Sequence, residues 1–283
     1  MPSQGFFLRR FRAGKSFIIR RTGEGLRLKG FRYYLKSIFT LFRGIKNPAA
    51  LFVLGFHKSP TYTARLQLKS GEVFLVRSLM DAWILKETCL DRQYEEASLP
   101  LQDGWTVLDI GAALGDYAVW AARQLPYGRL IAVEPYPPSI SLLRSNLEKN
   151  RIYNVEIFEG AVAASSGSAV LAVEEGRAVQ NSTASTKNES RSIEVKTISL
   201  QSLLEAYSVS VCDYLKMNCE GGEYDILFSV SSETLKRVKR ICMEVHDGMT
   251  VHDRQEMTAF LEKNGYKTGL TPNPVHRELA YLY

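Results

Sequence analysis

The stretch "VLDIGAALGDYAVW", Val107–Trp120, joins an apolar strand to an apolar helix through a turn that holds two glycines. The strand segment, Thr106–Ile110, is nearly all apolar, which is typical of a parallel strand buried on both faces. Gly111 and Gly115 permit positive φ angles and a close approach of the backbone to a ligand. Ligands of doubly wound sheets lie at the carboxyl ends of the strands, so we expect this turn to border a binding site.

Short apolar runs alternate with amphipathic segments along the rest of the chain, a pattern typical of a parallel α/β sheet. Further strands are predicted at Arg129–Val133, Val155–Phe158, Tyr214–Met217 and Arg240–Val245. Helices are predicted at Leu114–Gln124, Pro138–Asn150, Leu200–Ala206, Gly222–Phe228 and Arg254–Asn264. The final segments "GYKTGL" and "ELAYLY" have no helix between them, so we expect an antiparallel pair at the sheet edge. Residues 105–283 are therefore predicted to form a Rossmann-like, doubly wound α/β domain.

A hairpin and a helix in residues 61–104 are predicted to lead into this domain. Thr63–Ser78 alternates apolar and polar residues on both sides of a Ser-Gly pair, which is typical of a β-hairpin. Asp81–Ala97 is predicted to be a helix capped by its first residue. Two more strands are predicted in residues 167–195, on either side of the polar loop Asn181–Ser190.

The N-terminal extension, residues 1–60, carries the excess of basic charge. Residues 1–46 contain 12 Lys and Arg and a single acid, Glu24, which gives this segment a net charge of +11. The rest of the chain holds 24 basic and 29 acidic groups, so the body of the protein has a net charge of −5. An acidic body argues against nucleic-acid binding.

Apolar residues of the extension recur at helical spacing, at Phe31, Tyr34, Leu35, Ile38, Phe39 and Phe42. Arg32, Lys36 and Arg43 lie elsewhere on this amphipathic helix. Two interpretations stay open: the helix packs on the main domain with a solvated basic side, or it rests on anionic lipid. The apolar run after Pro48 is shorter than the roughly 20 residues of a transmembrane helix, and no secretory signal peptide is recognised. We expect a cytoplasmic protein, peripheral at the membrane if residues 1–46 contact anionic lipid.

Acidic residues around the first turn discriminate between two cofactors. Glu134 ends the second strand 25 positions after Asp109, and a carboxylate there can accept both hydroxyls of a ribose. Dinucleotide folds use GxGxxG, whose middle glycine admits the pyrophosphate, whereas this turn reads Gly-Ala-Ala-Leu-Gly. Asp109 and Asp116 would repel a pyrophosphate and suit a cationic ligand. S-adenosylmethionine has an ammonium, a sulfonium and a ribose, so the electrostatics favour it over NAD.

Four sequence elements occur in a recognisable order. They are "VLDIGAALGDY", "VEPYPPSISLLRSNLEKN" (Val133–Asn150), "DYLKMNCEGGEYDIL" (Asp213–Leu227) and "EVH" (Glu244–His246). Together they resemble the FkbM family of class I S-adenosylmethionine-dependent methyltransferases, over roughly residues 60–270. The resemblance implies a seven-stranded sheet, mostly parallel with an antiparallel last strand, and methyl transfer, mostly to oxygen, on small-molecule, polyketide or saccharide acceptors. Three positions depart from the family pattern, because Ala113 replaces an Asn, and Ser199 and Asn218 each replace an Asp.

Nine residues are predicted to bind the cofactor, at the first turn and near the ends of the next strands: Asp109, Gly111, Ala112, Gly115, Tyr117, Glu134, Pro135, Ala161 and Asn218. His246 ends the fifth strand and Glu220 follows the fourth, so both are candidates for taking a proton from a hydroxyl as it is methylated. Each also has a structural interpretation, since an acid such as Glu220 at a helix start favours the helix dipole. The four cysteines form no CxxC pair and show no zinc-ligand spacing, so no metal is expected.

The sequence thus predicts an S-adenosylmethionine-dependent O-methyltransferase that acts on a saccharide, a lipid-linked glycan or a secondary metabolite. Two alternatives stay open. One is an NAD-dependent oxidoreductase, which the Gly-Ala-Ala-Leu-Gly turn disfavours. The other is a cofactor-binding module with weak or no activity that holds a membrane or a partner through its basic arm, as suggested by Ala113, Ser199 and Asn218.

Overall fold

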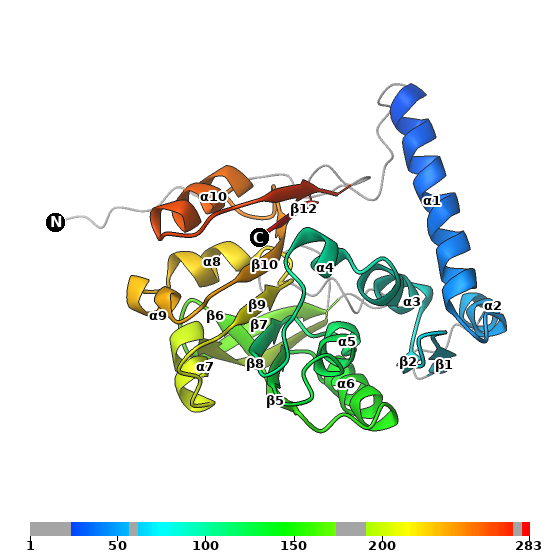
Figure 1. Ribbon diagram of the computed structural model, residues 1–283, viewed down its shortest axis with the longest axis horizontal. Coiled ribbons are helices and arrows are strands. Elements are labelled where there is room, and N and C mark those ends of the chain that lie inside the picture. Colours follow the sequence, from blue (N-terminus) through cyan, green and yellow to red (C-terminus); the bar gives the residue numbers. More distant parts are fainter. Residues whose placement is uncertain (1–23, 57–61, 174–190, 274–278) are drawn as a thin grey trace.

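The computed structural model describes residues 24–56, 62–173, 191–273 and 279–283. Figure 1 shows a central sheet with helices on both sides and one long helix, α1, at the edge of the molecule. The polar loop predicted at Asn181–Ser190 lies outside the described residues.

Within the described ranges, the main sheet has seven strands and confirms the predicted fold class. Its order is β11 (Leu270–Pro272), β12 (Leu279–Leu282), β10 (Ile241–His246), β9 (Tyr214–Met217), β3 (Thr106–Ile110), β4 (Arg129–Glu134) and β5 (Val155–Glu159). The five strands from β10 to β5 are parallel, and β12 runs antiparallel to both of its neighbours. The strand order reverses between β3 and β9, so the carboxyl ends of these strands frame the expected binding site.

Helices cover both faces of this sheet (Figure 1). One face packs against α5 (Asp116–Ala122) and α6 (Pro137–Lys149), and the other against α7 (Leu200–Ala206), α8 (Gly222–Phe228), α9 (Ser232–Lys236) and α10 (Arg254–Lys263). Successive strand residues alternate between the two cores: Val107 packs on the first side and Leu108 on the second. Burial on both faces is the reason that the strand segments are continuously apolar.

In the part of the chain that the structure describes, a second sheet of three strands extends from the β5 side. Its β6 (Ala161–Ala163) pairs parallel with β8 (Arg191–Ser199), and β8 pairs antiparallel with β7 (Gly167–Val173). The β7–β8 pair confirms the two strands predicted in residues 167–195. The sequence did not predict β6, because three residues are too few to show a periodic pattern.

The N-terminal part contributes α1 (Glu24–Gly44), α2 (Ala49–Phe56) and the predicted antiparallel hairpin of β1 (Ala64–Gln67) and β2 (Val73–Val76). The hairpin is tied to α6, because the side-chain oxygens of Asn146 and Asn150 accept the backbone N–H groups of Leu75 and Val73 at 2.7 and 2.9 Å. Residues of α1, α2 and the hairpin belong to the same hydrophobic core as α5 and α6. The extension is therefore built onto the sheet domain.

The helix predicted at Asp81–Ala97 is divided into three pieces: α3 (Leu79–Leu85), a π-helical segment η1 (Lys86–Leu90) and α4 (Gln93–Ala97). Ser78 is the N-cap, since its hydroxyl accepts the N–H of Asp81 at 3.1 Å, so the prediction of Asp81 as the cap was wrong. The buried Asp81 instead forms an ion pair with Arg77 at 3.0 Å. Arg92 then adopts a left-handed conformation, with φ +55°, which separates η1 from α4.

Candidate active site

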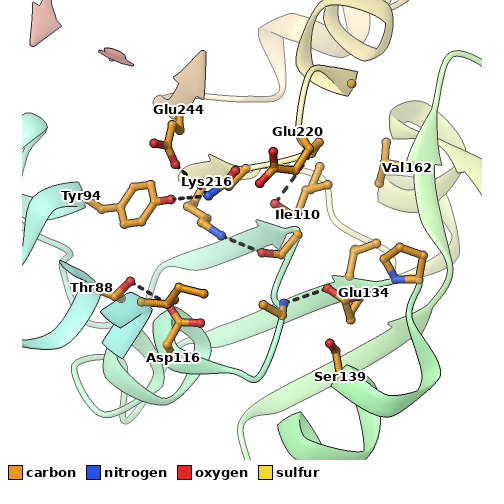
Figure 2. A pocket seen from close by; sticks show the side chains of 18 of the residues that line it. Thr88, Tyr94, Ile110, Asp116, Glu134, Ser139, Val162, Lys216, Glu220 and Glu244 are labelled. Atoms are coloured by element: carbon orange, nitrogen blue, oxygen red, sulfur yellow. Dashed lines mark hydrogen bonds between the residues drawn. The ribbon is translucent and has the colours of Figure 1, made fainter. Parts of the chain in front are cut away.

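An open cavity lies at the carboxyl ends of β3, β4, β9 and β10, with about 1080 Å³ of space when the solvent at its mouth is included (Figure 2). The α3–η1–α4 segment closes one side of it with residues such as Thr88 and Tyr94. Among the described residues that line it, five carry a carboxyl group and one an amine: Glu87, Asp116, Glu134, Glu220, Glu244 and Lys216. The excess of carboxyl groups suits a cationic ligand.

Asp109, the acid of the first turn, lies behind the cavity wall. Its side chain is fully buried, and its Oδ1 lies 2.8 Å from the Nζ of Lys216, its register partner on β9. Burial lowers the pKa of Lys216, but attraction to Asp109 and Asp116 outweighs burial and raises this pKa above its ordinary value. Lys216 therefore stays charged and neutralises Asp109, one of the two aspartates that the sequence argument had assigned to a cationic ligand.

Lys216 is a residue of the site that sequence reasoning missed. Its ammonium donates to the carbonyl oxygen of Gly111 at 2.9 Å and lies 5.3 Å from the ring centre of Tyr94. It thereby fixes the turn after β3 from the neighbouring strand. The sequence feature that could have revealed Lys216 is a single Lys inside the apolar strand "YLKM". A buried amine requires a carboxylate partner, so this Lys predicts an acid nearby.

Positive φ angles and close neighbours favour glycine at both positions of the turn. Gly111 has φ +80°, and a Cβ there would lie 1.9 Å from the carbonyl oxygen of Asn218. Gly115 has φ +87°, and a Cβ there would lie 2.5 Å from Cδ1 of Leu143 in α6. Gly111 also lines the cavity. Three other residues predicted to bind the cofactor are buried behind the cavity wall and do not line it: Ala112, Gly115 and Tyr117.

Glu134, at the end of β4, faces the cavity as a fixed carboxylate (Figure 2). It is 7% exposed, and its two oxygens accept the backbone N–H groups of Ala113 at 2.8 Å and Tyr136 at 2.9 Å. Burial raises the pKa of Glu134 to about 7, although the two hydrogen bonds oppose this shift. Pro135 and Ala161 line the cavity next to it and add little polar surface.

Ala113 occupies a strained position in the turn. Its φ is +47°, in the left-handed region that residues with a Cβ adopt at a cost. Asn is among the residues enriched there, which gives a physical reason for the Asn of the family pattern. Because Ala113 acts on Glu134 through its backbone N–H, the contact does not depend on the side chain.

Asn218 and Glu244 form a second polar group at the ends of β9 and β10. Nδ2 of Asn218 donates to Oε2 of Glu244 at 2.9 Å, and Oδ1 of Asn218 is buried without a hydrogen-bond partner. Both residues line the cavity, so this unpartnered oxygen points to a donor on a ligand. Burial raises the pKa of Glu244 to about 7, although His246 opposes the shift. Sequence reasoning missed Glu244 and chose its neighbour in "EVH" instead.

His246 and Glu220, the two candidates for taking up a proton, lie close to each other. Nε2 of His246 is 3.7 Å from Oε2 of Glu220, and its Nδ1 is 3.6 Å from Oε1 of Glu223. Burial lowers the pKa of His246, but Glu223, Glu220 and Glu244 outweigh burial and raise it to about 9. At neutral pH this imidazole is already protonated, so it is unsuited to take up a proton. Glu220 lines the cavity, and burial raises its pKa.

Comparisons with known proteins agree with this architecture. Residues 109–268 match the model of the Methyltransferase FkbM domain. The chain is 25% identical over 211 residues to the hexuronic acid methyltransferase AglP of Haloferax volcanii, a match that covers 74% of this chain and 80% of the relative. It is 23% identical over 223 residues to the methyltransferase sdnD of Sordaria araneosa, covering 68% of this chain and 85% of the relative.

Among solved structures, Aeropyrum pernix fibrillarin in complex with S-adenosyl-L-methionine is similar with a TM-score of 0.45 and 15% identity, over 81% of this chain and 85% of that chain. The family match stands on its own, because residues 109–268 are more than half of the 283 residues. The protein belongs to the FkbM methyltransferase family and is an S-adenosylmethionine-dependent methyltransferase.

Proposed function

We propose that the cavity holds S-adenosylmethionine and that the enzyme methylates a hydroxyl group brought to its Glu244 side. The bound cofactor supplies a methyl group that its sulfonium already activates, so the protein mainly has to align the acceptor. The observation that carries the proposal is the unpartnered Oδ1 of Asn218 in the cavity wall, beside the carboxylate of Glu244.

The residues present fit this cofactor. Each oxygen of Glu134 keeps a lone pair after accepting its backbone N–H, so the carboxylate can accept the ribose hydroxyls. Oδ1 of Asn218 lacks a donor, which the ammonium of the methionine part can supply. Five carboxyl groups around the cavity favour a cation over the pyrophosphate of NAD. The buried pair of Asp109 and Lys216 supports the turn from behind.

Glu244 is the general base that the geometry favours. A base for a hydroxyl must lie at the acceptor and have a pKa near the working pH. Glu244 lines the cavity, its pKa is raised to about 7, and Asn218 orients it by hydrogen bonding. Glu220 is the second candidate, because it also lines the cavity. His246 is assigned a positioning role, since its charge holds the neighbouring carboxylates.

The acceptor that fits best is a neutral hydroxyl on a saccharide, a lipid-linked glycan or a secondary metabolite. AglP is named for hexuronic acid, and sdnD only as a methyltransferase. The carboxyl groups of this cavity repel a free uronic acid, so a neutral sugar is favoured over an anionic one. We place the enzyme in the cytoplasm, peripheral at the membrane.

Calorimetric titration of the full chain with S-adenosylmethionine tests cofactor binding, and Glu134→Ala is expected to weaken it. Incubation of host-extract fractions with methyl-labelled S-adenosylmethionine then tests transfer, and a hydroxyl acceptor gives a base-stable methyl ether. Glu244→Gln is expected to bind the cofactor normally and to lose at least about 100-fold in transfer rate. Binding without transfer to any fraction supports the catalytically silent alternative, and no binding by the wild type refutes the assignment of the cavity.

A further inference from the structure

From Phe31 onward, helix α1 presents three different faces. Ser37 and Leu41 of the helix are buried against the domain, as is Ile45 just after the helix ends. A second face is apolar and between 37% and 62% exposed, and it contains Phe31, Leu35, Ile38, Phe39 and Phe42. The helix therefore packs on the domain, but five of the six apolar residues from which it was predicted stay well exposed; the sixth, Tyr34, packs its ring against that of Trp83 in α3 at 5.8 Å.

This exposed apolar face continues onto the neighbouring helices. Phe52, Val53 and Phe56 of α2 are between 45% and 85% exposed, and Leu79 and Met80 at the start of α3 are about half exposed. The ring of Phe42 lies 5.7 Å from that of Phe52, which joins the α1 and α2 parts. We call these ten side chains the apolar patch. Single exposed apolar residues are ordinary, whereas a contiguous group of this size marks an interaction surface.

The border of the apolar patch is basic. Residues 25–71 contain nine Lys and Arg and no Asp or Glu. Arg32, Lys36 and Arg43 are exposed and form the third face of α1, next to its apolar face. Apolar side chains with basic neighbours are the composition of helices that lie in the headgroup region of anionic membranes.

We propose that the apolar patch docks the enzyme on an anionic lipid bilayer, with its basic border on the lipid headgroups. No helix in the described ranges is long and apolar enough to cross a bilayer, so this contact lies at the membrane surface. A second copy of the chain is a poorer partner, because symmetric pairing brings the basic borders together without an acid in residues 25–71 to neutralise them. The proposal goes beyond methyl transfer and does not depend on the acceptor.

Hydrogen bonds connect the docking helix to the cavity. The hydroxyl of Tyr33 in α1 donates to Oε1 of Glu87 at 3.1 Å, and the indole of Trp83 donates to the same oxygen at 2.9 Å. Glu87 lines the cavity, so these hydrogen bonds link α1, which carries part of the apolar patch, to the wall of the active site. Docking through α1 would therefore hold the active site near the bilayer, where a lipid-linked acceptor is found.

Vesicle flotation of the full chain tests this docking. Strong binding is expected to phosphatidylcholine vesicles with about 30% phosphatidylglycerol, weaker binding to pure phosphatidylcholine, and a decrease with added salt. The double variant Leu35→Gln with Phe56→Gln is expected to reduce the partition coefficient at least about tenfold. Both side chains are exposed, so the variant keeps its fold, which circular dichroism verifies. The matched control is Tyr127→Gln with Tyr153→Gln, two aromatic residues of the main domain that are 90% and 87% exposed.

A second double variant, Arg32→Gln with Lys36→Gln, separates charge from apolar insertion. It is expected to lose about fivefold per residue on anionic vesicles and little on neutral ones. Equal flotation of the Leu35/Phe56 variant and the tyrosine control overturns the proposal, as does failure of the wild type to float. If the wild type is a dimer that the Leu35/Phe56 variant converts to a monomer, and neither protein binds vesicles, the apolar patch contacts a second copy of the chain instead of lipid. Cofactor titration of every variant shows whether the cavity is intact, so a failure of docking is distinguished from a failure of the site.

Discussion

Replacing Glu134 by Gln is expected to favour the folded protein at high pH and to weaken cofactor binding. Burial raises the pKa of Glu134 from its ordinary 4.5 to about 7. The folded state therefore binds this proton more tightly than the unfolded state, and folding stability decreases as the pH rises from 4.5 through 7. Gln does not ionise, so the variant lacks this loss.

The size of the effect follows from the two pKa values. The difference between 4.5 and about 7 corresponds to a loss of about 3 kcal/mol once the group is fully ionised. Between about pH 5 and about pH 8 the linkage relation gives a change of about 2–3 kcal/mol. Gln also turns an NH₂ group toward the N–H of Ala113 or Tyr136, which costs about 1–3 kcal/mol at every pH. Comparing two pH values removes this constant cost.

Urea unfolding of both proteins at the two pH values measures the change, and calorimetry at the higher pH measures cofactor binding. Loss of hydrogen bonds to a charged acceptor is expected to weaken binding by about 10- to 150-fold. Glu159→Gln is the control, because Glu159 is the register partner of Glu134 on β5 but is 54% exposed. If the free-energy difference between variant and wild type is the same at both pH values, the reasoning about burial is refuted. If cofactor binding is unchanged, Glu134 is not the ribose ligand.

Three further substitutions test the charged groups behind and beside the cavity. Lys216→Met leaves Asp109 buried without its partner and is expected to cost about 3–5 kcal/mol in urea unfolding, part of which the added change Asp109→Asn restores. His246→Asn removes an imidazole whose pKa is raised from 6.5 to about 9. The charged imidazole stabilises the folded state most below pH 6.5, and this stabilisation is lost as the pH rises through 9. The melting temperatures of variant and wild type are therefore expected to converge over that pH range. Asn218→Asp places a second carboxylate 2.9 Å from Glu244 and is expected to shift the ascending limb of the pH–rate profile to higher pH; an unchanged profile argues against Glu244 as the base.

Much of the fold could be predicted from the sequence because local patterns determine it. The strands Thr106–Ile110 and Tyr214–Met217 and the helices Leu200–Ala206 and Gly222–Phe228 have the predicted boundaries. In each, the apolar periodicity agrees with the burial that the sheet imposes. The segment at Asp81 differs because its break comes from the backbone of Arg92, which apolar periodicity does not reveal.

The site could be predicted only in part, because its contacts join residues that are distant in the sequence. Glu134 and Asn218 follow strand ends, a position that a pattern identifies. The pairing of Lys216 with Asp109 depends on the register of β9 against β3, and the exposure of Glu244 to the cavity depends on the position of β10. Neither relation is encoded by spacing along the chain.

The cationic ligand expected from the sequence has a different origin in the structure. The sequence argument relied on the charges of Asp109 and Asp116, and Lys216 neutralises Asp109 at 2.8 Å. The negative charge of the cavity comes instead from glutamates on four separate elements: η1 for Glu87, β4 for Glu134, the β9–α8 turn for Glu220 and β10 for Glu244. Burial raises the pKa of each of these glutamates, so their ionised forms are held at a cost to folding. A bound cation relieves that cost, so part of the free energy spent in keeping these glutamates ionised becomes available for cofactor binding.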